Sequence, residues 1–510
     1  MNLRPLLPLA DGAAVALHDV CATRAIEAQA LQTHPGGVLM QRAGLRVAQL
    51  ARALHPHAQR LLVVCGPGNN GGDGLVAATA LHQALRPSGT AVGVLFSHGP
   101  PRRGDAAAAW TQAQAAGVVV HENWPDGVDV AIDALLGIGA RAPLDPTTHG
   151  LLEALNRVPT VLCVDLPTGL DADHGTWQGP ALRPEQQRHT LSLLTLKPGL
   201  FTAAGRDAAG RVWWDDLGSG ELAKDSGAAC ARLIGTGAST PSPHNSHKGA
   251  HGEVTVIGGQ LPQVGRTGML GAAALAARAA LHHGAGRVYV CPLGDSPPHW
   301  DPQQPDLRWR DGGQVEAQAP HPQHVWLAGC GGGEAVSARL ARLLRHDGPL
   351  VLDADALNAL AAQRDPSHFR RQRQGRLSVL TPHPLEAARL LGCTTAEVQA
   401  QRLDSAQRLA DAHEAIVVLK GSGSVIAAPD LLPIINSTGN GRLGIAGTGD
   451  VLAGMLAARC ARQALGPDLE AAQWAIAGGV AQHGALADHW PQGQPLTAAA
   501  LAGATEAWRA

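Results

Sequence analysis

The first half of the chain alternates short apolar runs with segments in which apolar residues have helical spacing. The helical spacing is clearest at residues 75–85, and the apolar runs cover residues 61–66, 90–96, 129–137 and 160–167. A nearly continuous apolar run predicts a strand that is buried on both faces. Such strands separated by helices predict a parallel sheet covered by helices on both sides.

The second half repeats this pattern, with Ala-rich helical segments at residues 269–286 and 450–465. Its apolar runs cover residues 253–259, 287–291, 324–330, 350–355, 377–382 and 415–421. Between the halves, residues 218–247 are rich in Gly, Ser, Ala and Pro, a composition that suits a linker or an entry strand. We therefore predict two α/β domains, residues 1–218 and 245–510, with residues 219–244 as the linker.

Composition excludes several classes of protein. The 510 residues are 45% hydrophobic and carry a formal net charge of −2, which fits a globular protein and gives no basic surface for nucleic acid. Aromatic residues make up 3%, too few for a platform on which bases stack. No run of 18 apolar residues and no signal-peptide pattern is present, and the eight cysteines form no CxxC motif. We expect a cytoplasmic protein without a membrane span.

The segment GPGNNGGDG (66–74) directly follows a predicted strand and precedes a predicted helix. Its glycines leave backbone N–H groups open in front of a helix N-terminus, which is the physical basis of an anion or phosphate site. A plain glycine-rich turn is the alternative, but two asparagines and an aspartate in the same turn favour a binding role.

Further polar residues follow neighbouring strands of the first half. Asp133 lies near the end of one strand, and Asp165 ends the next, with Thr168 close behind. The carboxyl ends of parallel strands face the ligand crevice of an α/β sheet. Asn70 could therefore converge with these three, and their oxygens could hold a hard cation or a hydroxyl-rich ligand. Separate helix caps and turn residues are the alternative.

NNGGDG, DALLGIG, DLPTG and LKPGL, in this order, resemble the NAD(P)HX epimerase family over about residues 1–218. The resemblance implies a Rossmann-like three-layer fold, Asp165 in the acid–base role, and K⁺ held by Asn70, Asp133 and Thr168. Thr168 stands where the family more often has Ser, which keeps the hydroxyl. The resemblance implies that the hydrated dinucleotide contacts Asn69, Asn70, Gly71, Gly72, Asp73, Gly137, Ile138, Gly139, Ala140, Arg141, Ala142, Pro143 and Asp165.

The second half carries NSTGNGRLGIAGTGDVLAG (436–454), in which GTGD opens an Ala-rich helix. The N–H groups of Gly447 to Gly449 can form an anion hole, and Asp450 beside it can take a proton from a substrate hydroxyl. The alternative is that Asp450 is only an N-cap.

Two further segments of the second half carry candidate polar groups. VVLKGSGSVIA (417–427) suits a nucleotide, or else is an exposed hairpin. His383 lies in a strand-to-helix turn with Glu386 in the first helical turn, where a lone histidine is more often structural.

These segments together with HGEVTVIGG, DADALN and TPHP resemble the ADP-dependent NAD(P)HX dehydratase family, which has a ribokinase-like fold, over about residues 245–490. The resemblance implies substrate contacts at Ala272, Gly331, His383 and Asp450. It implies ADP contacts at Lys420, Gly421, Ser422, Gly423, Ser424 and Gly449, with Mg²⁺ as a further candidate ion. Two residues depart from the family pattern: Cys330 stands where Pro is usual, and Leu385 where Gly is usual.

Both resemblances imply one repair pathway for hydrated nicotinamide cofactors. The substrates would be NADHX and NADPHX: the first domain would interconvert their R and S epimers, and the second would dehydrate the S form with ADP bound. We expect a homo-oligomer. The alternatives are that the second domain is a small-molecule kinase, because GTGD and a nucleotide cradle also suit phosphorylation, and that the first domain only binds ligand or mediates assembly.

Overall fold

The computed structural model describes residues 5–7, 9, 13–139, 143–236, 244–262, 267–294, 301, 303–317, 321 and 323–504. The chain divides into two compact units. Unit 1 comprises Met1–Pro8 and Ala16–Ala231, and unit 2 comprises Leu9–Val15 and Arg232–Ala510.

Unit 1 contains a seven-stranded sheet in which every pairing is parallel. The strand order is β4 (Val119–His121), β3 (Ala91–Phe96), β2 (Arg60–Cys65), β5 (Val130–Ala134), β6 (Thr160–Val164), β7 (Gln187–Leu193) and β8 (Arg211–Asp215). The chain runs from β2 outward to β4 and then returns to β5. The switch point of the sheet therefore lies between β2 and β5, where ligands bind in open α/β sheets.

The strands of unit 1 are apolar throughout because each of their faces has its own core. Leu61, Val63 and Cys65 of β2 pack into one cluster, whereas Leu62 and Val64 pack into another on the opposite face. The helices of unit 1 are α1 (Val20–Thr33), α2 (Val38–Leu54), α3 (Asn69–Leu85), α4 (Gly104–Ala115), α5 (Pro146–Leu155), α6 (Gly205–Ala209) and α7 (Gly220–Asp225).

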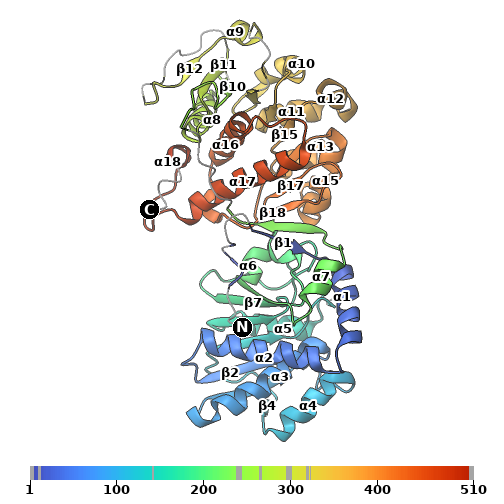
Figure 1. Ribbon diagram of the computed structural model, residues 1–510. Coiled ribbons are helices and arrows are strands. Elements are labelled where there is room, and N and C mark those ends of the chain that lie inside the picture. Colours follow the sequence, from blue (N-terminus) through green and yellow to red (C-terminus); the bar gives the residue numbers. More distant parts are fainter. Residues whose placement is uncertain are drawn as a thin grey trace. The chain divides into compact units, whose positions relative to one another are not determined.

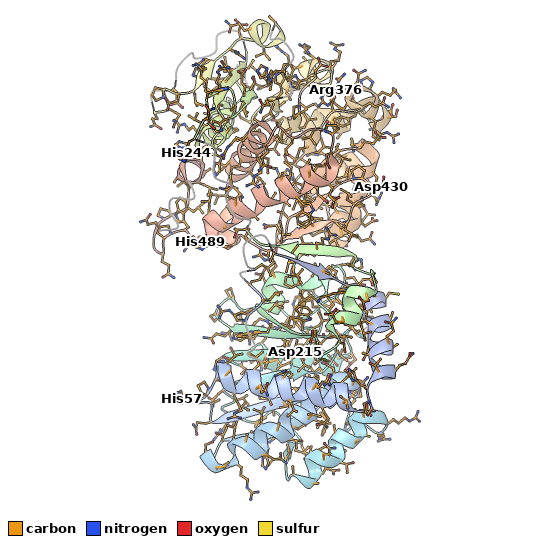
Figure 2. The ribbon with its side chains drawn as sticks, viewed as in Figure 1. His57, Asp215, His244, Arg376, Asp430 and His489 are labelled. Atoms are coloured by element: carbon orange, nitrogen blue, oxygen red, sulfur yellow. The ribbon has the colours of Figure 1, made fainter. Side chains whose placement is uncertain are left out.

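Helices α2 and α3 lie side by side (Figure 1) and belong to the first of these clusters. An ion pair 2.8 Å long between Arg46 Nε on α2 and Asp215 Oδ2 at the end of β8 joins this layer to the edge of the sheet. Asp215 is labelled in Figure 2.

Unit 2 contains a longer sheet of eleven strands. The order is β1 (Ala14–Leu17), β9 (Ala231–Ile234), β18 (Ile434–Asn436), β17 (Val425–Ala427), β16 (Ile416–Leu419), β15 (Ser378–Leu380), β14 (Leu350–Leu352), β13 (His324–Ala328), β10 (Glu253–Gln260), β11 (Arg287–Leu293) and β12 (Arg308–Trp309). Pairing is parallel from β12 to β16, and β17 is antiparallel to both of its neighbours. The switch point lies between β10 and β13.

The helices of unit 2 cover both faces of the parallel part of its sheet, and each face again has its own core cluster. Helices α8 and α16 lie side by side (Figure 1) because glycine permits close contact: a Cβ atom at Gly454 would lie 2.0 Å from the carbonyl oxygen of Ala276. The helices are α8 (Leu270–His282), α9 (Gly312–Glu316), α10 (Leu340–Leu344), α11 (Ala354–Ala362), α12 (Pro366–Arg373), α13 (Pro384–Leu391), α14 (Thr395–Ala400), α15 (Arg402–His413), α16 (Thr448–Arg462), α17 (Leu469–Asp488) and α18 (Ala498–Gly503).

The predicted α/β class with two domains is confirmed, and each predicted apolar run contains a strand. The stretch proposed as a linker, 219–244, contains helix α7 and strand β9, so part of it enters the second sheet; residues 237–243 lie outside the described residues. Sequence analysis did not identify β7, which begins with polar residues, or the short strand β18, and it considered β17 only as part of an exposed hairpin. Within the described residues, no helix has the length and apolar character that crossing a membrane requires.

Candidate active sites

The glycine-rich turn of unit 1 packs closely against the end of β5 at the switch point. A Cβ atom at Gly66 would lie 1.8 Å from the carbonyl oxygen of Leu135, and one at Gly71 would lie 2.0 Å from that of Gly66. Helix α3 starts at Asn69, and its N-cap, Gly68, provides no side-chain hydrogen bond. The first N–H groups of α3 therefore keep their capacity to bind an anionic ligand.

Asp133 and Thr168 meet in the interior next to this turn. The Thr168 hydroxyl and N–H donate to the two carboxylate oxygens of Asp133 at 2.7 and 2.9 Å, and the N–H of Leu135 donates at 3.2 Å. Burial raises the pKa of Asp133, and these hydrogen bonds only partly offset the effect. A buried carboxylate and hydroxyl are oxygen ligands of the kind that a hard cation prefers.

Asn70 at the start of α3 converges with Gly137 and Asp165, which lie in two loops. A Cβ atom at Gly137 would lie 3.4 Å from Asn70 Oδ1 and 3.5 Å from Asp165 Oδ2. The Nδ2 atom of Asn70 is buried without a hydrogen-bond partner, which marks a polar group placed to meet a ligand. Gly72 and Asp73 continue the first turns of α3, Ile138 and Gly139 follow Gly137, and Pro143 is exposed, whereas Ala140, Arg141 and Ala142 lie outside the described residues.

Asp165 is held in an unusual backbone conformation directly after β6. Its φ of 64° lies in the left-handed region, which aspartate tolerates better than most residues and which often marks functional sites. Its Oδ1 accepts hydrogen bonds from Lys197 Nζ at 2.5 Å and from the N–H of Leu193 at 3.1 Å. Sequence analysis quoted Lys197 within LKPGL but gave it no role, because nothing in the motif indicates its partner.

Two more carboxylates face Asp165. Burial and the charges of Asp165 and Glu27 raise the pKa of Asp73 well above its ordinary value. Burial and the charge of Asp165 also raise the pKa of Glu27, which lies on α1. Sequence analysis missed Glu27 because α1 carries no recognisable motif. This site of unit 1 therefore combines three carboxylates with one buried lysine.

In unit 2, Asp450 is the third residue of α16 rather than its N-cap. The N-cap is Gly447, with a φ of 93° and no capping side chain, so the interpretation of Asp450 as a mere cap is wrong. The N–H groups at the start of this 15-residue helix remain available next to the Asp450 carboxylate.

Asp450 belongs to a compact buried cluster at the carboxyl ends of β13 and β14. Ligand atoms of Asp450, Asp353 and Cys330 all lie within 4.8 Å of one another. Asp353 Oδ1 accepts from Lys420 Nζ at 2.6 Å and from the Thr381 hydroxyl at 2.8 Å. Burial and the Asp353 charge raise the pKa of Asp450 to about 6. Burial, together with the charges of Asp450 and Asp353, also raises the pKa of Cys330, so its thiol stays neutral beside them.

The loop 420–424 is the turn of the β16–β17 hairpin, whose strands are buried, not exposed as the alternative had it. Arg402 binds the back of this loop: its Nη2 donates to the carbonyl oxygens of Leu419, Lys420 and Gly423 at 3.2, 3.2 and 3.4 Å. A Cβ atom at Gly449 would lie 3.4 Å from Lys420 Nζ. The loop and the start of α16 therefore border one space. Ser422 and Ser424 lie in the same turn as Gly421.

The remaining predicted residues of unit 2 lie on neighbouring elements. Gly331 and Ala272 are adjacent, since a Cβ atom at Gly331 would lie 2.9 Å from that of Ala272. His383 is the N-cap of α13, and its Nδ1 accepts from the N–H groups of Leu385 and Glu386 at 3.2 and 3.4 Å. Burial opposes ionisation of Glu386, but hydrogen bonds from His383 and the charge of Lys420 outweigh it and lower the Glu386 pKa. His383 therefore caps α13, and its side chain is 46% exposed.

Comparison with known proteins supports the assignment of the two units. Residues 36–199 match the family model described as YjeF-related protein N-terminus, and residues 254–506 match the one described as NAD(P)H-hydrate dehydratase. The chain is 36% identical over 470 residues to the bifunctional NAD(P)H-hydrate repair enzyme of Escherichia coli strain K12, covering 88% of this chain and 84% of that protein.

Two solved structures are similar to part of the chain. One is the ADP/ATP-dependent NAD(P)H-hydrate dehydratase from Bacillus subtilis, co-crystallized with ATP/Mg²⁺, at 29% identity and a TM-score of 0.42 over 51% of this chain and 90% of that one. The other is a ribokinase-like superfamily protein from Enterococcus faecalis V583, at 24% identity and a TM-score of 0.42 over 52% of this chain and 88% of that one.

The hydrogen bond from Thr168 to Asp133 gives a stability prediction. Thr168→Val removes the hydroxyl at nearly constant volume and leaves a buried carboxylate oxygen with one donor fewer, which should cost about 1–3 kcal/mol. Thr168→Ser keeps the hydroxyl and should stay close to wild type. Hydrogen exchange of the β5 and β6 amides measures the free energy of opening, and equal values for Val and Ser would contradict the assigned role.

Proposed function

Because this chain belongs to the family of bifunctional NAD(P)H-hydrate repair enzymes, we propose that it carries out both repair reactions on NADHX and NADPHX. Unit 1 epimerises the R and S hydrates, and unit 2 dehydrates the S form back to NAD(P)H with ADP bound. The observation that supports the proposal is a site at the carboxyl ends of parallel strands in each unit, with a glycine-rich turn at a helix start and an aspartate beside it. The hydrates bear a hydroxyl at nicotinamide C6 and no longer donate hydride.

The dehydration site supports a division of roles among a few residues. The ionised Asp450 carboxylate accepts a hydrogen bond from the C6 hydroxyl. The hydroxyl takes a proton from solvent and leaves as water while the N1 lone pair forms a double bond to C6. Asp450 then accepts the proton that C5 loses as the C5=C6 double bond of NAD(P)H forms. As the C6–O bond breaks, the N–H groups of Gly447 to Gly449 face the negative charge on the departing oxygen. The nucleotide phosphates face the positive charge that develops on the nicotinamide ring. The loop of Lys420, Gly421, Ser422, Gly423 and Ser424, together with Gly449, holds the ADP, and Ala272, Gly331 and His383 border the nicotinamide.

In the epimerisation site, Asp165 exchanges protons with the substrate as the C6–O bond opens and re-forms. The oxygen leaves as water when it receives a proton while the N1 lone pair forms a double bond to C6, and water that adds to the other face gives a proton back. Asp73, whose pKa is raised, suits the proton donor, and Asp165 suits the acceptor. The dinucleotide lies along Asn69 to Asp73 and Gly137 to Pro143.

K⁺ is the cofactor that we propose for unit 1, held by Asn70, Asp133 and Thr168. The oxygen chemistry of these side chains fits a hard cation. When bound, K⁺ fixes the positions of neighbouring groups rather than acting as a strong Lewis acid. For unit 2 we propose that Mg²⁺ accompanies the nucleotide.

The organisation of the chain completes the proposal. We propose domains at residues 1–218 and 245–510, a homo-oligomer, and a cytoplasmic location. The eight cysteines, all free in the structure, are consistent with a reducing compartment.

Incubation of the purified chain with a mixture of R and S hydrates, with and without ADP, tests this function. Recovery of NAD(P)H absorbance from all of the hydrate in the presence of ADP requires both activities. Recovery of the S portion alone would show that unit 1 does not epimerise. Consumption of ATP with release of a phosphorylated product and no recovered NAD(P)H would favour the small-molecule kinase.

Single substitutions should separate the two activities. Asp450→Asn removes the proton acceptor and should lower dehydration by at least about 10²–10³-fold, comparable to the loss of an oxyanion donor. Epimerisation should remain. Asp165→Ala should have the opposite pattern, measured as R–S interconversion by chromatography. Unchanged dehydration in the first variant, or unchanged interconversion in the second, would refute that residue's role.

Dehydration should also depend on pH through Asp450. The pKa of this carboxyl is raised to about 6, and the ionised form is the one that accepts a proton. We therefore expect kcat/KM to be constant above pH 7 and to fall about tenfold per pH unit below 6, since it reports ionisation in the free enzyme. Epimerisation by the same chain is the control for acid damage. A midpoint of the dehydration profile near pH 4 would contradict the effect that we assign to the buried surroundings of Asp450.

A further inference from the structure

Lys197 is a buried cation that the mechanism above leaves without a role. We propose that it is a positioning residue of the epimerase, which holds Oδ1 of Asp165 so that Oδ2 is the oxygen that exchanges a proton with the substrate. This inference rests on the proposed epimerase function of unit 1.

The ammonium group of Lys197 is enclosed by acceptors. Its Nζ lies 2.5 Å from Asp165 Oδ1, 2.8 Å from the carbonyl oxygen of Leu193 and 3.4 Å from the Ser192 hydroxyl. These three contacts use all three donors of an ammonium group. The side chain is 1% exposed, so solvent does not share in its stabilisation and its position is fixed.

Asp165 is fixed on its other sides as well. Its N–H donates to the carbonyl oxygen of Leu191 at 2.8 Å, and the N–H of Leu193 donates to the same Oδ1 that binds Lys197. Among the described residues, no donor is assigned to Oδ2, which faces Gly137. The two oxygens therefore have different surroundings: Oδ1 is bound by the protein, and Oδ2 is left for a ligand.

A purely structural ion pair does not explain why Oδ1 of Asp165 is bound by the protein while Oδ2 is left without a donor. Burying two charges is costly unless the remaining hydrogen-bonding positions are filled, and here one carboxylate oxygen is left open. The groups facing Asp165 from the other elements are Asp73 on α3 and Glu27 on α1, both acidic, with Arg24 as a further positive charge near Glu27. Without Lys197, Asp165 would share a site with two carboxylates and would bind a proton more readily.

Lys197→Met tests the proposal, because it keeps a long side chain and removes the charge and the donors. We expect the acid limb of the epimerase pH profile to move up by at least about one pH unit, as loss of an adjacent opposite charge does. The kcat should fall by about 10²-fold, as expected for a misplaced catalytic group, with a smaller change in KM. Lys197→Arg keeps the charge and should restore most of the wild-type profile.

Two controls separate positioning from a loss of folding. Lys224→Met makes the same change at an exposed lysine of unit 1 and should leave epimerisation unchanged. Dehydration by the same chain and hydrogen exchange of the β7 amides report whether each variant is folded. If the Met variant does not fold, the Arg variant decides: a profile shifted in the Arg variant would overturn the proposal.

Carboxyl ¹³C NMR titration of Asp165 gives a readout that does not need activity. Its midpoint should lie higher in Lys197→Met than in wild type, and equal midpoints would overturn the proposal. A fall in thermal stability with an unchanged pH profile and kcat would likewise show a purely structural pair. Absence of epimerisation in the wild-type chain, with a shifted midpoint, would instead count against the proposed function and leave the positioning of Asp165 supported.

Discussion

A lysine buried against an aspartate, at the carboxyl ends of parallel strands, is the interaction on which both sites depend. Lys197 binds Asp165 in unit 1 and Lys420 binds Asp353 in unit 2, at 2.5 and 2.6 Å. Each pair lies where backbone turns crowd together and solvent is largely excluded, so each charge needs the other. The two units share no detectable sequence repeat. In unit 1 the paired residues follow the adjacent strands β6 and β7, and in unit 2 they follow β14 and β16, with β15 between them.

Each pair compensates one carboxylate and leaves another without a cation of its own. In unit 2, Asp353 takes the lysine and Asp450 keeps a pKa of about 6. In unit 1, Asp165 takes the lysine and burial raises the pKa of Asp73. Groups whose environments differ in this way can divide the tasks of accepting and holding a proton. Each unit therefore has an aspartate whose pKa is raised beside one that is paired with a lysine.

The sequence predicted two kinds of feature: elements with a repeating apolar pattern, and motifs whose residues are neighbours in the sequence. Buried strands such as 253–259 and 324–330 were recognisable because both of their faces are apolar. Asn70 and Asp450 were recognisable because glycines surround them at helix starts. Lys197 and Glu27 were not, because their significance comes from a contact with Asp165 that only the folded sheet creates. The hairpin that contains β17 was considered only as an exposed alternative, because its second strand is short and no crossover helix follows it.

Arg402 shows how the loop of residues 420–424 in unit 2 keeps its shape. Its guanidinium donates to the carbonyl oxygens of Leu419, Lys420 and Gly423 and so holds both ends of the turn together. A loop that is already ordered loses little conformational entropy when a ligand binds, so its ordering takes little from the binding free energy. The conformation of this loop is therefore set by a residue that lies outside it, at the start of α15.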